Sequence, residues 1–146
     1  MNIQVTTLLL LFLTLALCQS NLTEKNLLLI GNDNILEVLQ DQTTADAKPL
    51  FLFFMNRDCQ ECWDHSKDWI RLSTIANRQF SIGRTDCHFD HDVCVMFRVD
   101  GFPFILYFAE NKVFKYSSEG GLETKDFLEY LSADNFRESR VVIEDF

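Results

Sequence analysis

The chain has 146 residues, which is enough for one domain with a substantial core, and its composition is ordinary for a globular protein. It is 47% hydrophobic and 24% charged, and its fourteen phenylalanines predict a core rich in aromatic rings. The formal charge of −9 argues against a nucleic-acid or anionic-membrane surface, because phosphate binding needs clustered Lys and Arg.

The first eighteen residues differ in pattern from the rest. Leu8 to Leu17 is almost wholly apolar, and the small residues Ala16 and Cys18 stand at the −3 and −1 positions of a cut after Cys18. This pattern indicates a secretory signal peptide, residues 1–18, although no Lys or Arg precedes the apolar run. A membrane anchor is the alternative, but the run is shorter than the roughly 20 residues that a spanning helix needs. We therefore expect no membrane contact once this segment is removed.

Removal of the signal peptide would leave four cysteines, Cys59, Cys62, Cys87 and Cys94. An even number of cysteines in a secreted chain fits an oxidising compartment, so the expected location is the endoplasmic reticulum lumen or the exterior. Asn21 begins the pattern Asn-Leu-Thr, a glycosylation acceptor whose use is left open because it lies close to the new N-terminus.

In chain order, apolar patterns predict strands and helices that alternate. Strands are expected at 27–30, 50–55, 80–85, 104–108 and 113–116, the last two joined by a tight turn at Glu110-Asn111. Helices are expected after a cap at Asp33, over 61–77, and after a cap at Thr124, while 86–98 is helical or mixed.

This order predicts an α/β fold, a three-layer sandwich with a mixed central sheet flanked by helices. The expected domain covers residues 19–134. Residues 135–146 are expected to form a mostly polar tail that contains one β-like triplet, Val141 to Ile143.

Two cysteines stand where the buried strand at 50–55 turns into the helix, a context that suggests a redox pair. Asp58 can cap this helix, with Glu61 three residues on as in a capping box. That arrangement would put Cys59 in the first turn, where unpaired N–H groups and the helix dipole favour a thiolate. Cys59 is therefore the expected nucleophile, and Cys62, one turn further, the resolving thiol.

At this point the chain resembles the thioredoxin superfamily, and within it the catalytic domains of protein disulfide isomerases. The resemblance is carried by Cys59-Gln60-Glu61-Cys62 after a buried strand, by Thr85-Asp86-Cys87 with Cys94, and by Val99-Asp100-Gly101-Phe102-Pro103 before a strand. A lone CxxC would be weak, but a CxxC followed about forty residues later by Gly-aromatic-Pro is specific. The resemblance covers roughly residues 27–131.

The resemblance implies a thiol–disulfide oxidoreductase whose clients are proteins or peptides with cysteines. It implies that Pro103 is cis and lies against the CxxC, with Phe102 beside it to contact the client. It also matches Cys87 and Cys94 to a second cysteine pair of some isomerase domains. Seven residues of unbroken helix would separate these two by about 10.5 Å, so a disulfide between them requires a break in the helix. Given an oxidising compartment, we expect a structural disulfide between Cys87 and Cys94; two buried thiols or a second redox couple are the alternatives.

The sequence departs from the family at positions that affect the rate of thiol–disulfide exchange. The family usually has a buried acid six residues before the first CxxC cysteine, where this chain has Phe53, and Trp before that cysteine, where this chain has Asp58. Acidic side chains at Asp58 and Glu61 disfavour a thiolate and make the disulfide a weaker oxidant. We therefore expect a slow or specialised oxidoreductase.

Two other interpretations stay open at the sequence level. A redox-inert binding or chaperone module could keep the fold without the chemistry, which the missing acid makes plausible. A zinc site could use the four cysteines with nearby His65, His88 or His91, but zinc knuckles lie on short loops and not at a strand–helix junction. No metal or other cofactor is expected, and the sequence does not indicate the oligomeric state.

Overall fold

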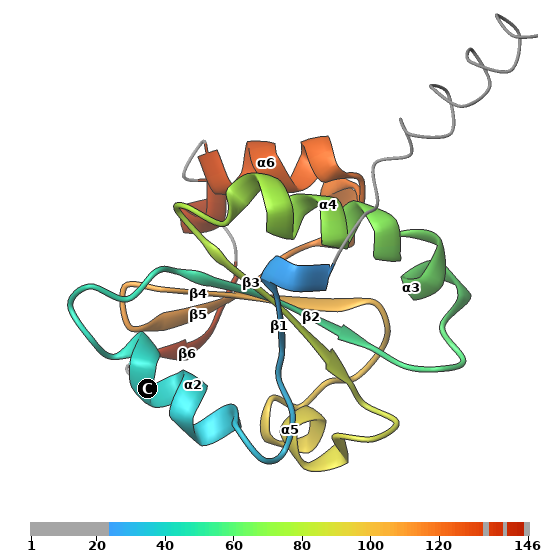
Figure 1. Cartoon of the computed structure of the whole chain (residues 1–146), viewed down its shortest axis with the longest axis horizontal. Helices are drawn as coiled ribbons and strands as arrows, with labels where there is room; N and C mark the ends of the chain where they lie inside the picture. The colour runs from blue at the N-terminus through green and yellow to red at the C-terminus, as the bar shows by residue number, and fades with distance from the viewer. Residues whose placement is uncertain (1–23, 133–134, 139, 145–146) are drawn as a thin grey trace, which may run out of the picture.

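The structure, a computed structural model, describes residues 24–132, 135–138 and 140–144; the predicted signal peptide and Asn21 lie outside the described residues. One sheet of six strands, in the order β1-β3-β2-β4-β5-β6, forms the centre of the molecule (Figure 1). The strands are β1 (Leu27–Leu29), β2 (Leu50–Met55), β3 (Ser81–Asp86), β4 (Phe104–Ala109), β5 (Lys112–Lys115) and β6 (Arg140–Glu144).

The sheet is mixed. Strands β1 and β2 both run parallel to β3, whereas β4 pairs antiparallel with β2, β5 with β4, and β6 with β5. The β4–β5 hairpin turns at Glu110 and Asn111, whose φ angles of 55° and 58° are those that a tight two-residue hairpin turn requires. This confirms the predicted hairpin.

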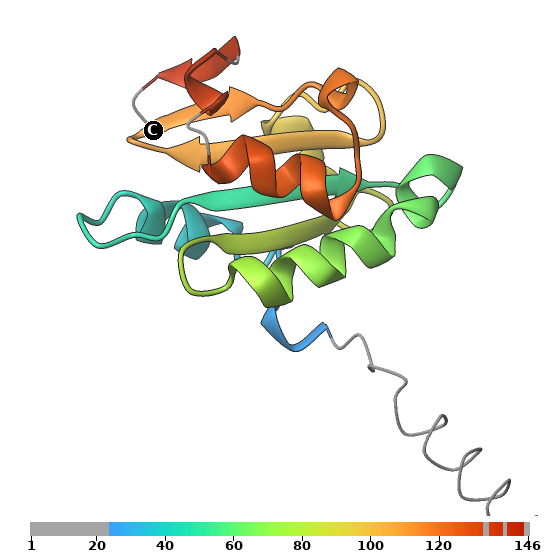
Figure 2. The same cartoon turned by 90° about the horizontal axis from the view of Figure 1, so that it is seen from above.

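Helices cover both faces of the sheet, which confirms the predicted three-layer α/β architecture. Figure 1 shows α4 and α6 over one face and α2 and α5 over the other, and Figure 2 shows the sheet between the layers. The helices are α2 (Ile35–Gln42), α3 (Gln60–Asp64), α4 (Ser66–Ala76), α5 (His91–Met96) and α6 (Thr124–Ser132), with short 3-10 turns η1 (Glu24–Asn26), η2 (Ser118–Gly120) and η3 (Asn135–Glu138).

Strand β2 is buried at all six positions because its side chains enter a core on each face. Phe51, Phe53 and Met55 join the aromatic-rich cluster under α4 and α6, and the alternate residues join the cluster under α2 and α5. A strand covered on both faces must be apolar at every position, which explains the continuous apolar run in the sequence. Strand β2 therefore holds the following CxxC segment on a rigid support.

The helix predicted over 61–77 is two helices, α3 and α4, with a break at His65. Its backbone angles, φ −97° and ψ 2°, lie outside the helical region, and the Ser66 hydroxyl donates to the Trp63 carbonyl at 2.8 Å. Such a local hydrogen bond offers the backbone an alternative to the helical ladder. Apolar spacing alone does not reveal this break.

The caps predicted for α2 and α6 were wrong. Helix α2 has Asn34, and not Asp33, at its N-cap, and the Asn34 side chain bonds backwards to Gly31 and Leu29. Thr124 is the first residue of α6, and its hydroxyl donates to Asp68 on α4 at 2.7 Å. The Asp68 carboxylate also accepts from the Thr124 N–H, so a neighbouring helix supplies the cap.

The last residues were predicted as a mostly polar tail, yet the described part contains η3 and β6. Val141 to Ile143, the β-like triplet, lies in β6, which pairs with β5. None of the helices within the described residues is long and apolar enough to cross a membrane.

Candidate active site: a disulfide at the start of a helix

Three loops gather at one edge of the sheet. Strand β2 ends at Met55 and leads to the CxxC, while β3 ends beside it, where the Cys87 N–H donates to the Met55 carbonyl at 2.9 Å. Strand β4 starts at the same edge, because Phe104 pairs with Phe54. The register therefore brings the CxxC, the Cys87 loop and the segment around Pro103 to one end of the molecule, which we call the disulfide edge.

Cys59 and Cys62 form a disulfide, with 5.3 Å between their Cα atoms. Cys62 is fully buried in the aromatic-rich core, whereas Cys59 is partly exposed at its edge. Only one sulfur of the pair can therefore be reached by a sulfur of another molecule. This asymmetry is the one that the predicted roles of nucleophile and resolving thiol require.

The N-cap of α3 is Cys59 and not Asp58 as predicted. Cys59 has extended angles, φ −87° and ψ 97°, and its Sγ accepts a hydrogen bond from the Cys62 N–H at 3.0 Å. The sulfur thus takes the capping position itself, because it reaches an N–H of the first turn that lacks a helical partner. A thiolate at Cys59 would be stabilised by the same N–H.

Charges close to the sulfur oppose this stabilisation. Asp58 and Glu61 are exposed, and neither has a basic partner among the described residues. A carboxylate near a thiol disfavours its ionisation. The backbone therefore favours a thiolate at Cys59, and the acidic side chains around it oppose one.

The core beneath Cys62 is aromatic at the position where the resemblance expects an acid. Phe53 is 2% exposed, and its ring stacks on Trp69 with 5.1 Å between centroids. Trp69 itself donates through Nε1 to the Gly83 carbonyl at 2.9 Å. Phe53, Cys62 and Trp69 belong to one apolar cluster, so no carboxyl at position 53 is available to receive a proton from Cys62.

The Phe102-Pro103 peptide bond is cis, as the resemblance implied. Phe102 is 37% exposed, and a hollow of about 250 Å³ lies beside these two residues. Lys115 borders this hollow, where it lies over the Phe104 ring and pairs with Asp100 at 3.5 Å. The apolar Phe102 side chain is thus exposed at the same end of the sheet as the CxxC.

Cys87 and Cys94 also form a disulfide, with 5.8 Å between their Cα atoms. The chain is not helical throughout this stretch, because α5 begins only at His91, which satisfies the condition stated from the sequence. Both cysteines are buried, so this second disulfide is the less accessible of the two. It ties the loop after β3 to α5.

Phe89, a further member of this surface, was not identified from the sequence. Trp63 is 47% exposed and donates through Nε1 to the Arg57 carbonyl, and the Arg57 guanidinium lies over the Phe89 ring at 5.6 Å. Phe89 is 67% exposed. Its exposure comes from the turn between Cys87 and α5, which no sequence period predicts.

The described residues form no group of three or more His, Cys, Asp or Glu that could hold a metal ion. All four sulfurs considered for zinc are used in disulfides in this oxidised form. His65 lies at the helix break, with its Nδ1 4.0 Å from an Asp68 carboxylate oxygen. His88 is exposed in the turn after β3, and His91 is exposed at the start of α5.

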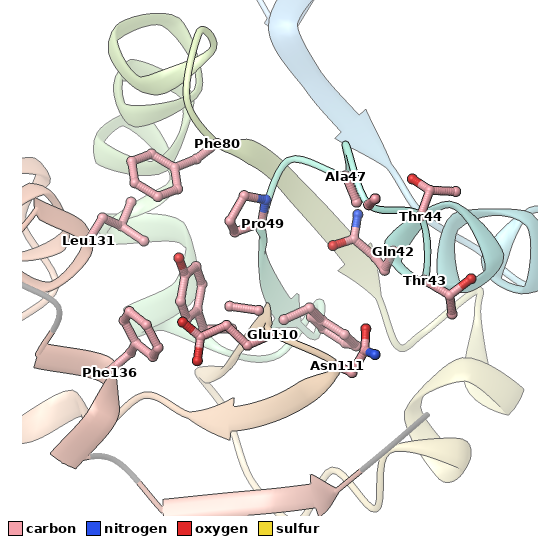
Figure 3. A pocket seen from close by; sticks show the side chains of 14 residues that line it. Gln42, Thr43, Thr44, Ala47, Pro49, Phe80, Glu110, Asn111, Leu131 and Phe136 are labelled. Atoms are coloured by element: carbon pink, nitrogen blue, oxygen red, sulfur yellow. The ribbon is translucent and has the colours of Figure 1, made fainter.

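A second hollow, of about 710 Å³, lies at the opposite end of the sheet (Figure 3). Phe80, Leu131 and Phe136 line one side of it, and Gln42 and Thr43 line the other. Because it adjoins the start of β2 and the end of β4, it lies away from the disulfide edge and takes no part in the site described here.

The chain has a thioredoxin-like fold, similar to that of protein disulfide isomerase domains, as the sequence predicted. The J-Trx1 fragment of ERdj5 matches with a TM-score of 0.64 at 16% identity, over 78% of this chain and 53% of that one. The first thioredoxin domain of mouse protein disulfide-isomerase A4 matches with a TM-score of 0.61 at 15% identity, over 78% of this chain and 81% of that one.

Among curated proteins, a thioredoxin domain-containing protein of Theileria parva is 24% identical over 114 residues. The match covers 78% of this chain and 51% of that protein, so this chain spans about half the length of its relative. No family model matches the sequence.

Proposed function

We propose that this protein is a thiol–disulfide oxidoreductase of the secretory pathway, acting on cysteine-containing proteins or peptides. The observation that carries the proposal is the asymmetric Cys59–Cys62 disulfide, with one sulfur partly exposed at a helix start and the other fully buried. The predicted signal peptide and the second disulfide, Cys87–Cys94, support an oxidising compartment. Retention in the lumen, secretion and use of Asn21 are left to experiment.

The exchange begins from the oxidised form. A client thiolate attacks Cys59 Sγ, the Cys59–Cys62 bond breaks, and Cys62 leaves as a thiolate that takes up a proton. A second client thiolate then attacks the client sulfur of the mixed disulfide and releases Cys59. The client gains a disulfide, and the two electrons it loses reduce the protein to the dithiol. The reverse sequence reduces or rearranges a client disulfide.

The local charges shift the equilibrium between the Cys59–Cys62 disulfide and the dithiol. Asp58 and Glu61 disfavour the thiolate of the reduced form, which makes the disulfide harder to reduce. Phe53 supplies no carboxyl to move the Cys62 proton, which slows resolution of the mixed disulfide. We propose a slow or specialised enzyme whose reduction potential lies below about −180 mV, and equilibration with glutathione measures it.

The direct test is turnover of an insulin-type disulfide substrate by the purified protein. Cys59→Ser should abolish turnover, and Cys62→Ser should accumulate a mixed disulfide with the substrate. The double variant Cys87→Ser/Cys94→Ser is the matched control, because it removes a disulfide but leaves the exposed sulfur in place. Turnover that persists in Cys59→Ser would refute the proposal.

A second candidate function is a redox-inert binding module. One specific observation favours it: the aromatic core at Phe53 provides no acid beneath the sulfurs. The same assay separates the two, because an inert module would show no Cys59-dependent turnover while still binding peptide through Trp63, Phe89 or Phe102.

A further inference from the structure

Charge at the disulfide edge is strongly one-sided. The three segments that meet there, 56–68, 86–92 and 98–103, carry eight carboxylates and three Arg or Lys residues, a formal charge of −5 with neutral His. Lys115 pairs with Asp100 at the same edge, which brings its formal charge to −4, out of −9 for the whole chain. Repulsion at this edge disfavours an acidic client and attraction favours a basic one.

Exposed aromatic rings lie on the same edge. Trp63 is 47% exposed and Phe89 is 67% exposed, and both contact Arg57, two residues before Cys59. An aromatic face attracts a guanidinium or ammonium group, and Arg is the more frequent partner. Because the Arg57 guanidinium already lies over Phe89, the surface shows that it can hold such a group.

Two carboxylates complete the arrangement. Asp58 and Glu61 flank Cys59 in sequence, are exposed, and have no ion-pair partner among the residues that the structure covers. Arg57, the basic residue next to them, is turned to the Phe89 ring. A cation brought in by a client would meet two unpaired carboxylates, Asp58 and Glu61, which flank Cys59 in sequence.

We propose, resting on the proposed function, that the preferred clients are basic segments, with Arg or Lys within a few residues of the reacting cysteine. Asp58 and Glu61 are the specificity-determining residues, and Phe89 holds the cation against its ring. The Cys87–Cys94 disulfide supports this surface because it fixes the loop that carries Phe89.

The experiment uses two peptides that differ only in their flanks, Arg-rich or Glu-rich, each with its single cysteine joined to 2-nitro-5-thiobenzoate. In the Cys62→Ser protein the Cys59 thiolate attacks the peptide sulfur, the peptide–nitrothiobenzoate bond breaks, and the coloured thiolate that leaves reports the rate. We expect the basic peptide to react at least about tenfold faster at about 20 mM salt near pH 8, and the ratio of the two rates to fall towards about twofold at about 500 mM.

The ratio of the two rates is the readout, because neutralising a carboxylate also changes the reactivity of Cys59 towards every peptide. Added to Cys62→Ser, the pair Asp58→Asn/Glu61→Gln should reduce the ratio to about threefold or less, and Phe89→Ser should also lower it. Asp41→Asn/Asp46→Asn is the matched control, since Asp41 lies in the last turn of α2 and Asp46 in the loop after it, both are exposed, and the charge change is equal. The ratio should be unchanged.

Two results would overturn the proposal, and they can be told apart. Equal rates for the two peptides, with reaction still dependent on Cys59, would refute the preference for basic clients and leave the oxidoreductase intact. No Cys59-dependent reaction with either peptide would refute the proposed function as well.

Discussion

The role of Phe53, which stands where the resemblance expects a buried acid, can be tested by introducing an acid at this position. In Phe53→Glu a carboxyl would enter a site that is 2% exposed and packed on Trp69 at 5.1 Å. Loss of a buried Phe side chain costs about 3–5 kcal/mol, and an unpaired buried carboxyl adds several more unless it stays protonated. The sum is comparable to the about 5–15 kcal/mol of a whole domain.

We therefore expect Phe53→Glu to be largely unfolded, and no faster in thiol exchange. Urea unfolding followed by tryptophan fluorescence measures the loss, because Trp69 lies against the substituted position. Phe53→Leu is the matched control, since it removes the ring without adding a charge, and it should cost about 1–2 kcal/mol. A Phe53→Glu protein as stable as Phe53→Leu and faster in exchange would show that this interior accepts a charge, which contradicts our reading of the core.

Two further predictions concern single hydroxyl groups. The Thr85 hydroxyl is buried without a hydrogen-bond partner among the described residues, so Thr85→Val should raise the free energy of unfolding in urea by about 1 kcal/mol. Thr74→Val, on the exposed face of α4, is the control and should change little. A loss of stability in Thr85→Val would show that the hydroxyl has a partner. Burial first, and then the negative charge of Asp126, raise the pKa of Tyr116 from 10.0 to about 12. The folded state therefore keeps this proton between pH 10 and 12 while the unfolded state loses it, so the contribution of Tyr116 to stability is complete below about pH 10 and lost as pH rises to about 12. A phenolate titration by ultraviolet absorbance should lose one tyrosine's amplitude near pH 12 in Tyr116→Phe, and an unchanged amplitude there would refute the assignment.

Local sequence patterns predicted much of the fold because each buried strand requires a run of apolar residues. Strand β2 was predicted at 50–55 and occupies those residues, since a strand covered on both faces must be apolar throughout. The Glu110-Asn111 hairpin was equally clear from its flanking apolar runs. The cysteine pair at the strand–helix junction was likewise visible in the sequence, because its spacing and its neighbours are local features.

The cap of α6 and the exposed surface could not be predicted, because they depend on residues far apart in the chain. Asp68 caps α6 across 56 residues, so no capping pattern marks Thr124. Arg57 and Phe89 meet only because β2 and β3 end side by side. Whether Trp63 is buried also depended on what packs against it.

The sequence by itself determined the order of strands and helices, the two-faced core and the presence of two thiols at a helix start. Those properties follow from apolar periodicity and short-range spacing, which act within a few residues. Only the tertiary structure decided that Cys59 is the accessible sulfur, that Cys87 is bonded to Cys94, and which rings and carboxylates surround the site. The exposure of a side chain and the charge around it depend on every segment that packs beside it, and the register of the sheet brings those segments together.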